Sequence, residues 1–207
     1  MIGCEEFWNK RSQIYDSQVG LEYKQANDKT AANTLKYLKP SDRVLDFACG
    51  TGLITVQIAP HVAELRGIDI SAEMVRRSQN KVAELDLQNV KITQTGIFDP
   101  CLEPGSFDAI TAFNVLCYVD NLDEVLARIH SLLKPGGYFL SATDCLASSV
   151  SAIGIKKFVR SHTGRMPYVA FFRTSGLERI IANAGFRVLE RENLFRSPPN
   201  LFIASQV

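Results

Sequence analysis

The sequence predicts an α/β protein with a doubly wound, mostly parallel sheet that ends in an antiparallel pair of strands. Short apolar runs alternate with helix-length amphipathic segments from residue 43 to residue 144, and this alternation favours parallel strands joined by right-handed helical crossovers. Two further apolar runs, residues 186–194 and 200–207, are joined by a connection too short for a helix. They therefore predict the antiparallel pair.

The individual elements follow from local patterns in chain order. Before Pro40, residues 28–39 place apolar side chains on one helical face and predict a helix. The predicted strands are residues 43–48, 63–70, 90–95, 108–116 and 138–144, and the predicted helices are residues 53–62, a helix capped by Ser71, 122–133 and 174–184. A turn is expected at Lys134–Gly137. The segment 146–171 is longer than a strand-to-helix connection needs, so we expect an inserted flap there.

Composition and charge narrow the class of protein. The chain of 207 residues fits a single domain, and its formal net charge of +1 argues against a nucleic-acid partner, which usually needs a basic face. No apolar run approaches the roughly 18 residues of a membrane span, and residues 1–11 lack a signal-peptide pattern. The five cysteines have no metal-ligand spacing, so no metal site is expected. These features predict a cytoplasmic protein that contacts no membrane.

The run Val-Leu-Asp-Phe-Ala-Cys-Gly-Thr-Gly at residues 44–52 carries the strongest functional signal. Its glycines allow a tight turn and a close approach to a ligand. Asp46 would repel a pyrophosphate, but it suits a ligand with an ammonium and a sulfonium group. The third position of a dinucleotide fingerprint starting at Gly50 is Thr55 and not glycine, which disfavours a nicotinamide cofactor.

A second acid, Asp69, ends the second predicted strand, 19 residues after Gly50. Roughly 20 residues separate the glycine loop from the ribose-binding acid of adenosine sites. The same carboxylate could instead only cap the helix that starts near Ser71. The glycine loop upstream favours the ribose-binding interpretation.

These motifs resemble those of the class I S-adenosylmethionine-dependent methyltransferases, which have a Rossmann-like fold. The resemblance covers residues 40–145 and includes the glycine loop, Gly67–Ser71, Gly105–Asp108 and Leu132–Phe139. It implies S-adenosylmethionine as the cofactor and a small-molecule methyl acceptor. It also implies one methyltransferase domain over residues 1–207, with a helical lid at residues 1–40 and the flap at 146–171 near the substrate.

The resemblance implies which residues contact the cofactor. Asp46, Gly50 and Gly52 would bind the methionine half, Asp69 would hold the ribose, and Asn114 would face the methyl-bearing end. The remaining implied contacts are Tyr15 from the lid, Ala48 from the glycine loop, and Ile70, Met74, Ile97, Phe98 and Asp99 around the adenine. The lid segment that includes Tyr15 could equally be a plain amphipathic helix on the sheet.

Two departures from the family pattern are visible. Ala48 stands where many relatives have glycine, and we expect a negative φ there, which alanine tolerates. Asn114-Val115-Leu116-Cys117 replaces the Asn-Pro-Pro-aromatic motif that follows the fourth strand in some relatives. This replacement disfavours methylation of the amino groups of bases or glutamine.

The predicted reaction is an in-line transfer of an activated methyl group, which requires mainly alignment and removal of water. A general base is needed only for an acceptor that must lose a proton. Asp144, His162 and Tyr168 are the candidates, and the sequence does not choose among them. Two alternatives stay open: a non-catalytic module that binds S-adenosylmethionine, and a nicotinamide-dependent oxidoreductase, which Asp46 and Thr55 disfavour.

Overall fold

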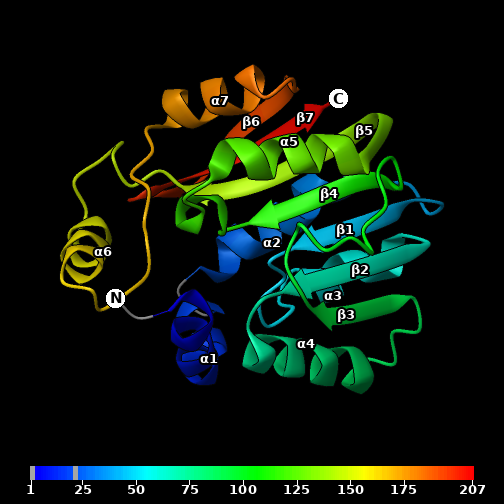
Figure 1. Ribbon diagram of the computed structural model, residues 1–207, viewed down its shortest axis with the longest axis horizontal. Helices are drawn as coiled ribbons and strands as arrows, with labels where there is room; N and C mark the ends of the chain where they lie inside the picture. The colour runs from blue at the N-terminus through cyan, green and yellow to red at the C-terminus, as the bar shows by residue number, and fades with distance from the viewer. Residues whose placement is uncertain (1–2, 21–22) are drawn as a thin grey trace.

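A computed structural model describes residues 3–20 and 23–207, and its centre is one sheet in the order β3-β2-β1-β4-β5-β7-β6 (Figure 1). The strands are β1 Arg43–Phe47, β2 Glu64–Asp69, β3 Val90–Gln94, β4 Phe107–Phe113, β5 Leu133–Asp144, β6 Arg187–Arg196 and β7 Pro199–Gln206. The first five run parallel, and β7 pairs antiparallel with both β5 and β6. The predicted fold class, including the antiparallel end, is confirmed.

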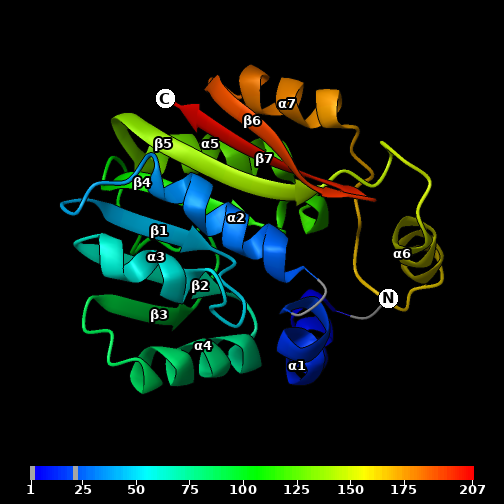
Figure 2. The same cartoon turned by 180° about the vertical axis from the view of Figure 1, so that it is seen from behind.

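Helices cover both faces of the sheet, as Figures 1 and 2 show from opposite sides. The helices are α1 Cys4–Tyr15, α2 Lys24–Leu35, α3 Thr55–Ile58, α4 Ala72–Glu84, α5 Leu122–Leu132, α6 Ala152–His162 and α7 Thr174–Asn183. Successive strand residues point to opposite faces. Leu45 accordingly packs in the cluster that contains buried residues of α5 and α7, whereas Val44 packs with those of α2 and α3.

Several boundaries differ from the sequence-based expectation. The helix expected at residues 28–39 begins at Lys24 and ends at Leu35. The expected helix at 53–62 is split into α3 and the 3₁₀ turn Ala59–His61. The strand expected at 108–116 ends at Phe113, because Asn114 has a φ of +57° that no strand adopts.

The expected turn at Lys134–Gly137 lies inside β5. In the pairing of β4 with β5, Phe107 lies opposite Leu133 and Ala109 lies opposite Tyr138. The four residues Lys134–Gly137 therefore correspond to the single residue Asp108 of β4 and form an irregularity in the strand. Bulges of this kind add residues to one strand without ending the sheet.

The two segments expected to surround the site are both partly helical. The lid segment, residues 1–40, contains α1, the π-helical turn Asp16–Gly20 and α2, while its residues 1–2 and 21–22 lie outside the described residues. The flap segment, residues 146–171, contains α6. None of the helices in the described part of the chain is long and apolar enough to cross a membrane.

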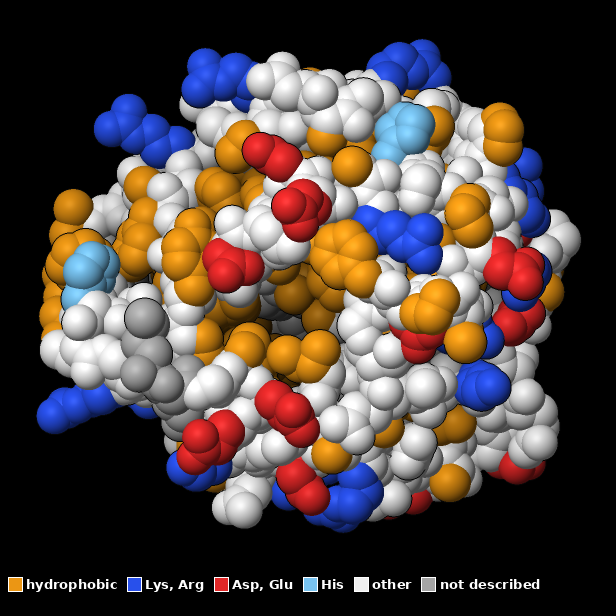
Figure 3. Space-filling view, in the orientation of Figure 1, with side chains coloured by type: hydrophobic (Ala, Val, Ile, Leu, Met, Phe, Trp, Pro, Cys, Tyr) orange, Lys and Arg blue, Asp and Glu red, His pale blue; other side chains and the backbone are white. Residues whose placement is uncertain are grey.

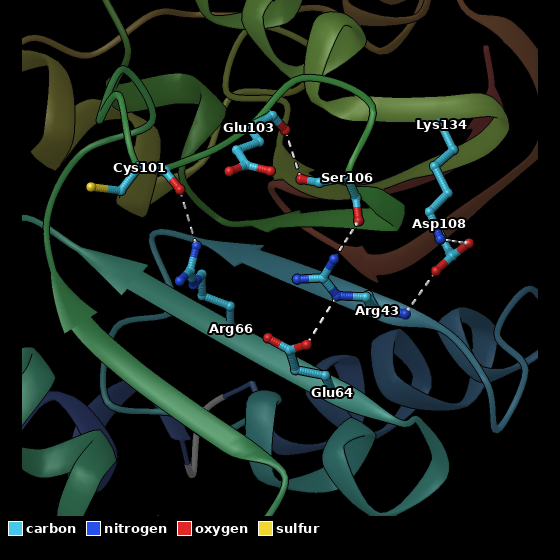
Figure 4. Close-up of polar contacts among 8 residues, drawn as sticks. All are labelled: Arg43, Glu64, Arg66, Cys101, Glu103, Ser106, Asp108 and Lys134. Atoms are coloured by element: carbon cyan, nitrogen blue, oxygen red, sulfur yellow. Dashed lines mark hydrogen bonds and ion pairs between the residues drawn. The ribbon is translucent and has the colours of Figure 1, made fainter.

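Polar contacts join neighbouring parallel strands near their amino-terminal ends (Figure 4). Arg43 Nε donates to Glu64 Oε2 at 2.9 Å, which links the first residues of β1 and β2. Asp108 in β4 accepts from the backbone N–H of Arg43 at 2.9 Å and from Lys134 Nζ at 2.7 Å. These contacts tie four strands together at the edge opposite to the carboxyl ends.

Candidate functional site

Four polar side chains gather where parallel strands end. Asp46 lies near the end of β1, Asp69 ends β2, Asn114 directly follows β4 and Asp144 ends β5. Because the carboxyl ends of parallel strands meet at one edge, these side chains share that edge of the sheet. Ligands of open α/β sheets bind in this position.

The glycine loop after β1 requires its glycines. Gly50 and Gly52 have φ values of +56° and +80°, in the left-handed region that favours glycine. A Cβ at Gly52 would also lie 2.5 Å from Oγ of Ser78 in α4. The loop therefore packs directly against α4, a contact with the protein itself that the sequence did not predict.

The prediction of a negative φ at Ala48 is wrong. Its φ is +56°, a conformation that costs a non-glycine residue roughly 1–2 kcal/mol. The loop reverses direction here between β1 and Gly50, and Cys49 N donates to Ile68 O at 3.0 Å, which holds this turn against β2. Asn114, with a φ of +57°, is a second left-handed residue at the same edge. Strain of this kind clusters at functional sites.

Asp69 is 9% exposed and has backbone partners on both oxygens. Its Oδ2 accepts from Gly50 N at 2.9 Å and its Oδ1 accepts from Ser71 N at 2.8 Å. Burial raises the pKa of Asp69 above its ordinary value. A carboxylate offers about four acceptor positions, so positions for further hydroxyl donors remain. Ser71 itself caps α4 as predicted, accepting from Met74 N at 3.2 Å.

Asp46 is almost fully buried beneath the glycine loop. Its two oxygens accept from Thr55 Oγ1 at 2.6 Å and Thr111 Oγ1 at 2.7 Å. Burial outweighs these hydrogen bonds and raises the pKa of Asp46 to about 6. A nearby positive charge would favour the ionised form of such a carboxylate. Asp46 lines a small cavity of about 40 Å³ together with Tyr15 and Asn114.

The edge cavity, defined here as the space of about 280 Å³ beside the ends of β1, β2 and β4, brings most of the predicted residues together. Figure 3 shows this face of the molecule hollowed, with hydrophobic side chains inside the hollow and acidic ones around it. The predicted residues that line the edge cavity are Tyr15, Ala48, Gly50, Asp69, Ile70, Met74, Ile97, Phe98 and Asn114.

Three predicted contacts do not line the edge cavity: Asp46, Gly52 and Asp99. Asp99 accepts from Thr95 Oγ1 at 2.6 Å and from Cys101 N at 2.8 Å, so its carboxylate fixes the turn after β3. Those hydrogen bonds, with that of Thr95 the largest influence, lower the pKa of Asp99. The neighbouring Gly96, Ile97 and Phe98 face the cavity instead.

The edge cavity also has walls that sequence reasoning missed. Trp8 of α1 lines it, and so do Thr95, Val115 and Asp120. Trp8 contacts Tyr118 edge-on, with ring centroids 5.1 Å apart. Trp8 lay in the predicted lid without being assigned a contact, and no family motif covers Thr95, Val115 or Asp120.

A second space, the lid cavity, lies between α1, α6 and the ends of β4 and β5, and has a volume of about 230 Å³. Four residues line both cavities: Trp8, Tyr15, Asn114 and Tyr118. The two cavities therefore adjoin across a wall formed by these side chains.

Asp144 is the candidate base that the structure brings to the lid cavity. Its Oδ2 accepts from Lys157 Nζ of α6 at 2.9 Å, and its Oδ1 accepts from Asn200 Nδ2 at 2.9 Å. Asn200 Nδ2 also donates to Asn114 Oδ1 at 2.8 Å. Burial alone would lower the pKa of Lys157, but the contacts with Tyr118 and Asp144 raise it above its ordinary value. Lys157 therefore stays protonated.

The other two candidate bases lie elsewhere. His162 is exposed near the end of α6, where its Nδ1 lies 2.9 Å from the carbonyl oxygen of Phe158. Tyr168 is 47% exposed. Neither lines the edge cavity or the lid cavity.

Side-chain contacts fasten the lid segment to the site. Asp16 accepts from Thr51 Oγ1 of the glycine loop at 2.5 Å and from Lys81 Nζ of α4 at 2.6 Å. Asn9 of α1 accepts from Ser71 Oγ at 2.7 Å. The lid is thus bonded to the elements that carry the glycine loop and Asp69.

Comparison with known proteins gives a consistent result. Residues 15–191 match a family model described as "Methyltransferase domain". A ubiquinone biosynthesis O-methyltransferase of Xanthomonas euvesicatoria pv. vesicatoria is 30% identical over 161 residues, covering 75% of this chain and 67% of the relative. One of the same name from Burkholderia pseudomallei is 27% identical over 166 residues, covering 77% and 70%.

The fold comparison agrees. A S-adenosylmethionine-dependent methyltransferase structure from Aquifex aeolicus superposes with a TM-score of 0.75 at 16% sequence identity. The match covers 96% of this chain and 98% of that one. At this identity the similarity concerns the fold alone.

Proposed function

The chain belongs to the methyltransferase domain family and is an S-adenosylmethionine-dependent methyltransferase, and we propose that it methylates a hydroxyl oxygen of a small molecule bound in the lid cavity. The family assignment excludes the nicotinamide-dependent alternative and favours an enzyme over a non-catalytic binding module. The oxygen acceptor is supported by the names of the relatives, which are O-methyltransferases. The observation that carries the proposal is the wall shared by the edge cavity and the lid cavity.

The residues of the edge cavity fit S-adenosylmethionine. Its apolar walls, which include Ile70 and Met74, suit an adenine ring. Asp69 keeps acceptor positions for the two ribose hydroxyls. Asp46, buried with a raised pKa, suits a positively charged methionine half, because a cation stabilises its ionised form.

When bound, S-adenosylmethionine supplies a methyl group on a positively charged sulfur, so the protein has to align and deprotonate the acceptor. Asn114 lines both cavities and is held by Asn200, which suits it to positioning the acceptor next to the methyl group. Burial raises the pKa of Tyr15 to about 12, so its phenol stays protonated and acts as a donor and not as a base.

Asp144 is proposed as the general base. It lines the lid cavity beside Asn114, and the proton of the acceptor hydroxyl passes to one of its carboxylate oxygens. Lys157, which is paired with Asp144, stays protonated and stabilises the negative charge that develops on the acceptor oxygen. The residue roles, the closing of the lid and flap segments over the acceptor and the expected cytoplasmic location all stay predictions.

The test of the cofactor site is the variant Asp69→Ala. Titration calorimetry is expected to detect tight S-adenosylmethionine binding to the wild type and at least a hundredfold weaker binding to the variant, because the ribose hydroxyls lose their charged acceptor. Glu84→Ala, at the exposed end of α4, is the matched control and should bind as the wild type does. Unchanged affinity in a folded Asp69→Ala protein would remove the assignment.

A further inference from the structure

One face of α6 points to the lid cavity. Ile153, Lys156, Lys157 and Arg160 line it, and their spacing of three, four and seven residues places them on one side of a helix. Arg11 of α1 lines the cavity as well. Four basic side chains thus surround a space in which Asp144 is the one lining carboxylate among the described residues.

The basic side chains differ in whether an acid neutralises them. Lys157 is paired with Asp144, and both side chains are largely buried, at 18% and 11% exposed. Arg11, Lys156 and Arg160 have no acidic partner within the part of the chain that the structure describes. Arg11 donates to the neutral Gln18 at 2.9 Å. The lid cavity therefore has an excess of positive charge.

The rest of the lid cavity is aromatic. Phe7, Trp8, Tyr15 and Tyr118 line it, and the ring centroids of Phe7 and Trp8 lie 5.1 Å apart. The guanidinium of Arg160 lies 6.0 Å from the ring centroid of Phe7, so one cation borders the aromatic wall directly. At about 230 Å³ the space is compact and fits a ligand of one or two rings.

We propose that the methyl acceptor is a hydroxylated aromatic ring that carries an anionic group, a carboxylate or a phosphate. The ring lies against the aromatic wall near Asn114, and Arg11, Lys156 and Arg160 bind the anionic group. Lys and Arg form their strongest hydrogen bonds with such groups. This inference rests on the proposed function, since it names the substrate class of the same site.

Binding can be measured without turnover, because Trp8 is the single tryptophan of the sequence and lines both cavities. Trp8 fluorescence is titrated with dihydroxybenzoate, with its neutral methyl ester and with dihydroxyphenyl phosphate. At least one of the two anions is expected to bind about tenfold more tightly than the ester. Comparing the affinities of the two anions shows whether the site prefers a carboxylate or a phosphate.

The charge requirement is tested with the double variant Lys156→Glu and Arg160→Glu. It should lose the preference for the anion while keeping the affinity for the ester. The matched control Arg165→Glu makes the same kind of charge change within the flap segment at an exposed residue that does not line the cavity, and it should keep the preference.

Two outcomes would overturn the inference: equal or tighter binding of the ester, or an unchanged anion preference in the double variant. The proposed function fails separately, if calorimetry detects no S-adenosylmethionine binding, or if the bound acceptor gains no methyl group when incubated with S-adenosylmethionine and analysed by mass spectrometry. Methylation of the neutral ester with a higher kcat/KM than either anion would leave the proposed function intact and reject the inference alone.

Discussion

Asp46 shows how burial sets the charge of a single residue in this protein. In the folded chain its pKa is about 6, above the ordinary value of 3.8. The folded state therefore binds the proton more tightly than the unfolded state does. The stabilising contribution of protonated Asp46 is complete below about pH 4 and is lost as the pH rises through 6.

This shift gives a pH prediction. Relative to Asp46→Asn, the wild type without ligand should lose on the order of 3 kcal/mol of unfolding free energy between about pH 4 and about pH 6, because the variant has no ionisable group there. Urea unfolding of both proteins across this range measures the difference. A difference that stays constant with pH would contradict the raised pKa.

For single residues, the sequence predicted which residues lie at the site better than it predicted their backbone and side-chain conformations. Asp69, Gly50 and Asn114 were predicted because strand ends and loop glycines have recognisable spacing, and all three line the edge cavity. Asp99 and Ala48 were harder to predict. The side-chain direction of Asp99 depends on its hydrogen bond with Thr95. The positive φ of Ala48 was missed because a non-glycine residue was expected to adopt a negative φ.

Among the elements that enclose the site, the lid segment is held in place partly through Asp16. Asp16, in the π-helical turn after α1, is bonded to the glycine loop through Thr51 and to α4 through Lys81. The ion pair with Lys81 is only partly exposed, at 24% and 36% of the two side chains. Such a contact stabilises more than a fully exposed pair does.

Removing this contact should loosen the lid. Asp16→Ala is expected to increase hydrogen exchange in α1 and to weaken S-adenosylmethionine binding roughly three- to tenfold, since the order of the glycine loop depends partly on Thr51. Exchange followed by mass spectrometry and calorimetry measure the two effects. Asp28→Ala, which removes only the exposed ion pair of α2 with Lys24, is the control. Equal exchange in both variants would show that Asp16 does not hold the lid.

The order of the elements was largely readable from the sequence, while their ends were not. Alternating apolar runs predict parallel strands because buried strands need covering helices. Helix α6 was expected only as part of a flap, since glycine and serine interrupt its pattern and its apolar face includes exposed Ile155 and Phe158. The irregularity at Lys134–Gly137 follows from pairing with β4, which local patterns do not describe.

In the molecule as a whole, the polar contacts between strands shown in Figure 4 and the residues that line the cavities lie at opposite edges of the sheet. Ion pairs and hydrogen bonds close the amino-terminal edge of the sheet (Figure 4), whereas the opposite edge opens into the two cavities. Residues that line the cavities come from the lid, the flap and the strand ends. Ligand binding should therefore stabilise the lid, the flap and the strand ends together.

Saturation with S-adenosylmethionine is expected to stabilise the whole fold. At a ligand concentration of about one hundred times Kd, the gain is about 2.7 kcal/mol, which corresponds to an increase in Tm of roughly 5–10 °C for a chain of this size. Differential scanning fluorimetry measures it. The same concentration does not exceed the Kd expected for Asp69→Ala, so that variant should gain at most about 0.4 kcal/mol, or roughly 1 °C in Tm. An equal increase in the variant and the wild type would place the binding outside the edge cavity.

Trp8, Tyr15, Asn114 and Tyr118 each line both cavities, so the two spaces are neighbours. An inhibitor that joins adenosine to an aromatic acid through a short linker would therefore occupy both spaces at once. Once its first half is bound, the second half meets its cavity at an effective concentration in the millimolar range, so the linked compound should bind far more tightly than either fragment.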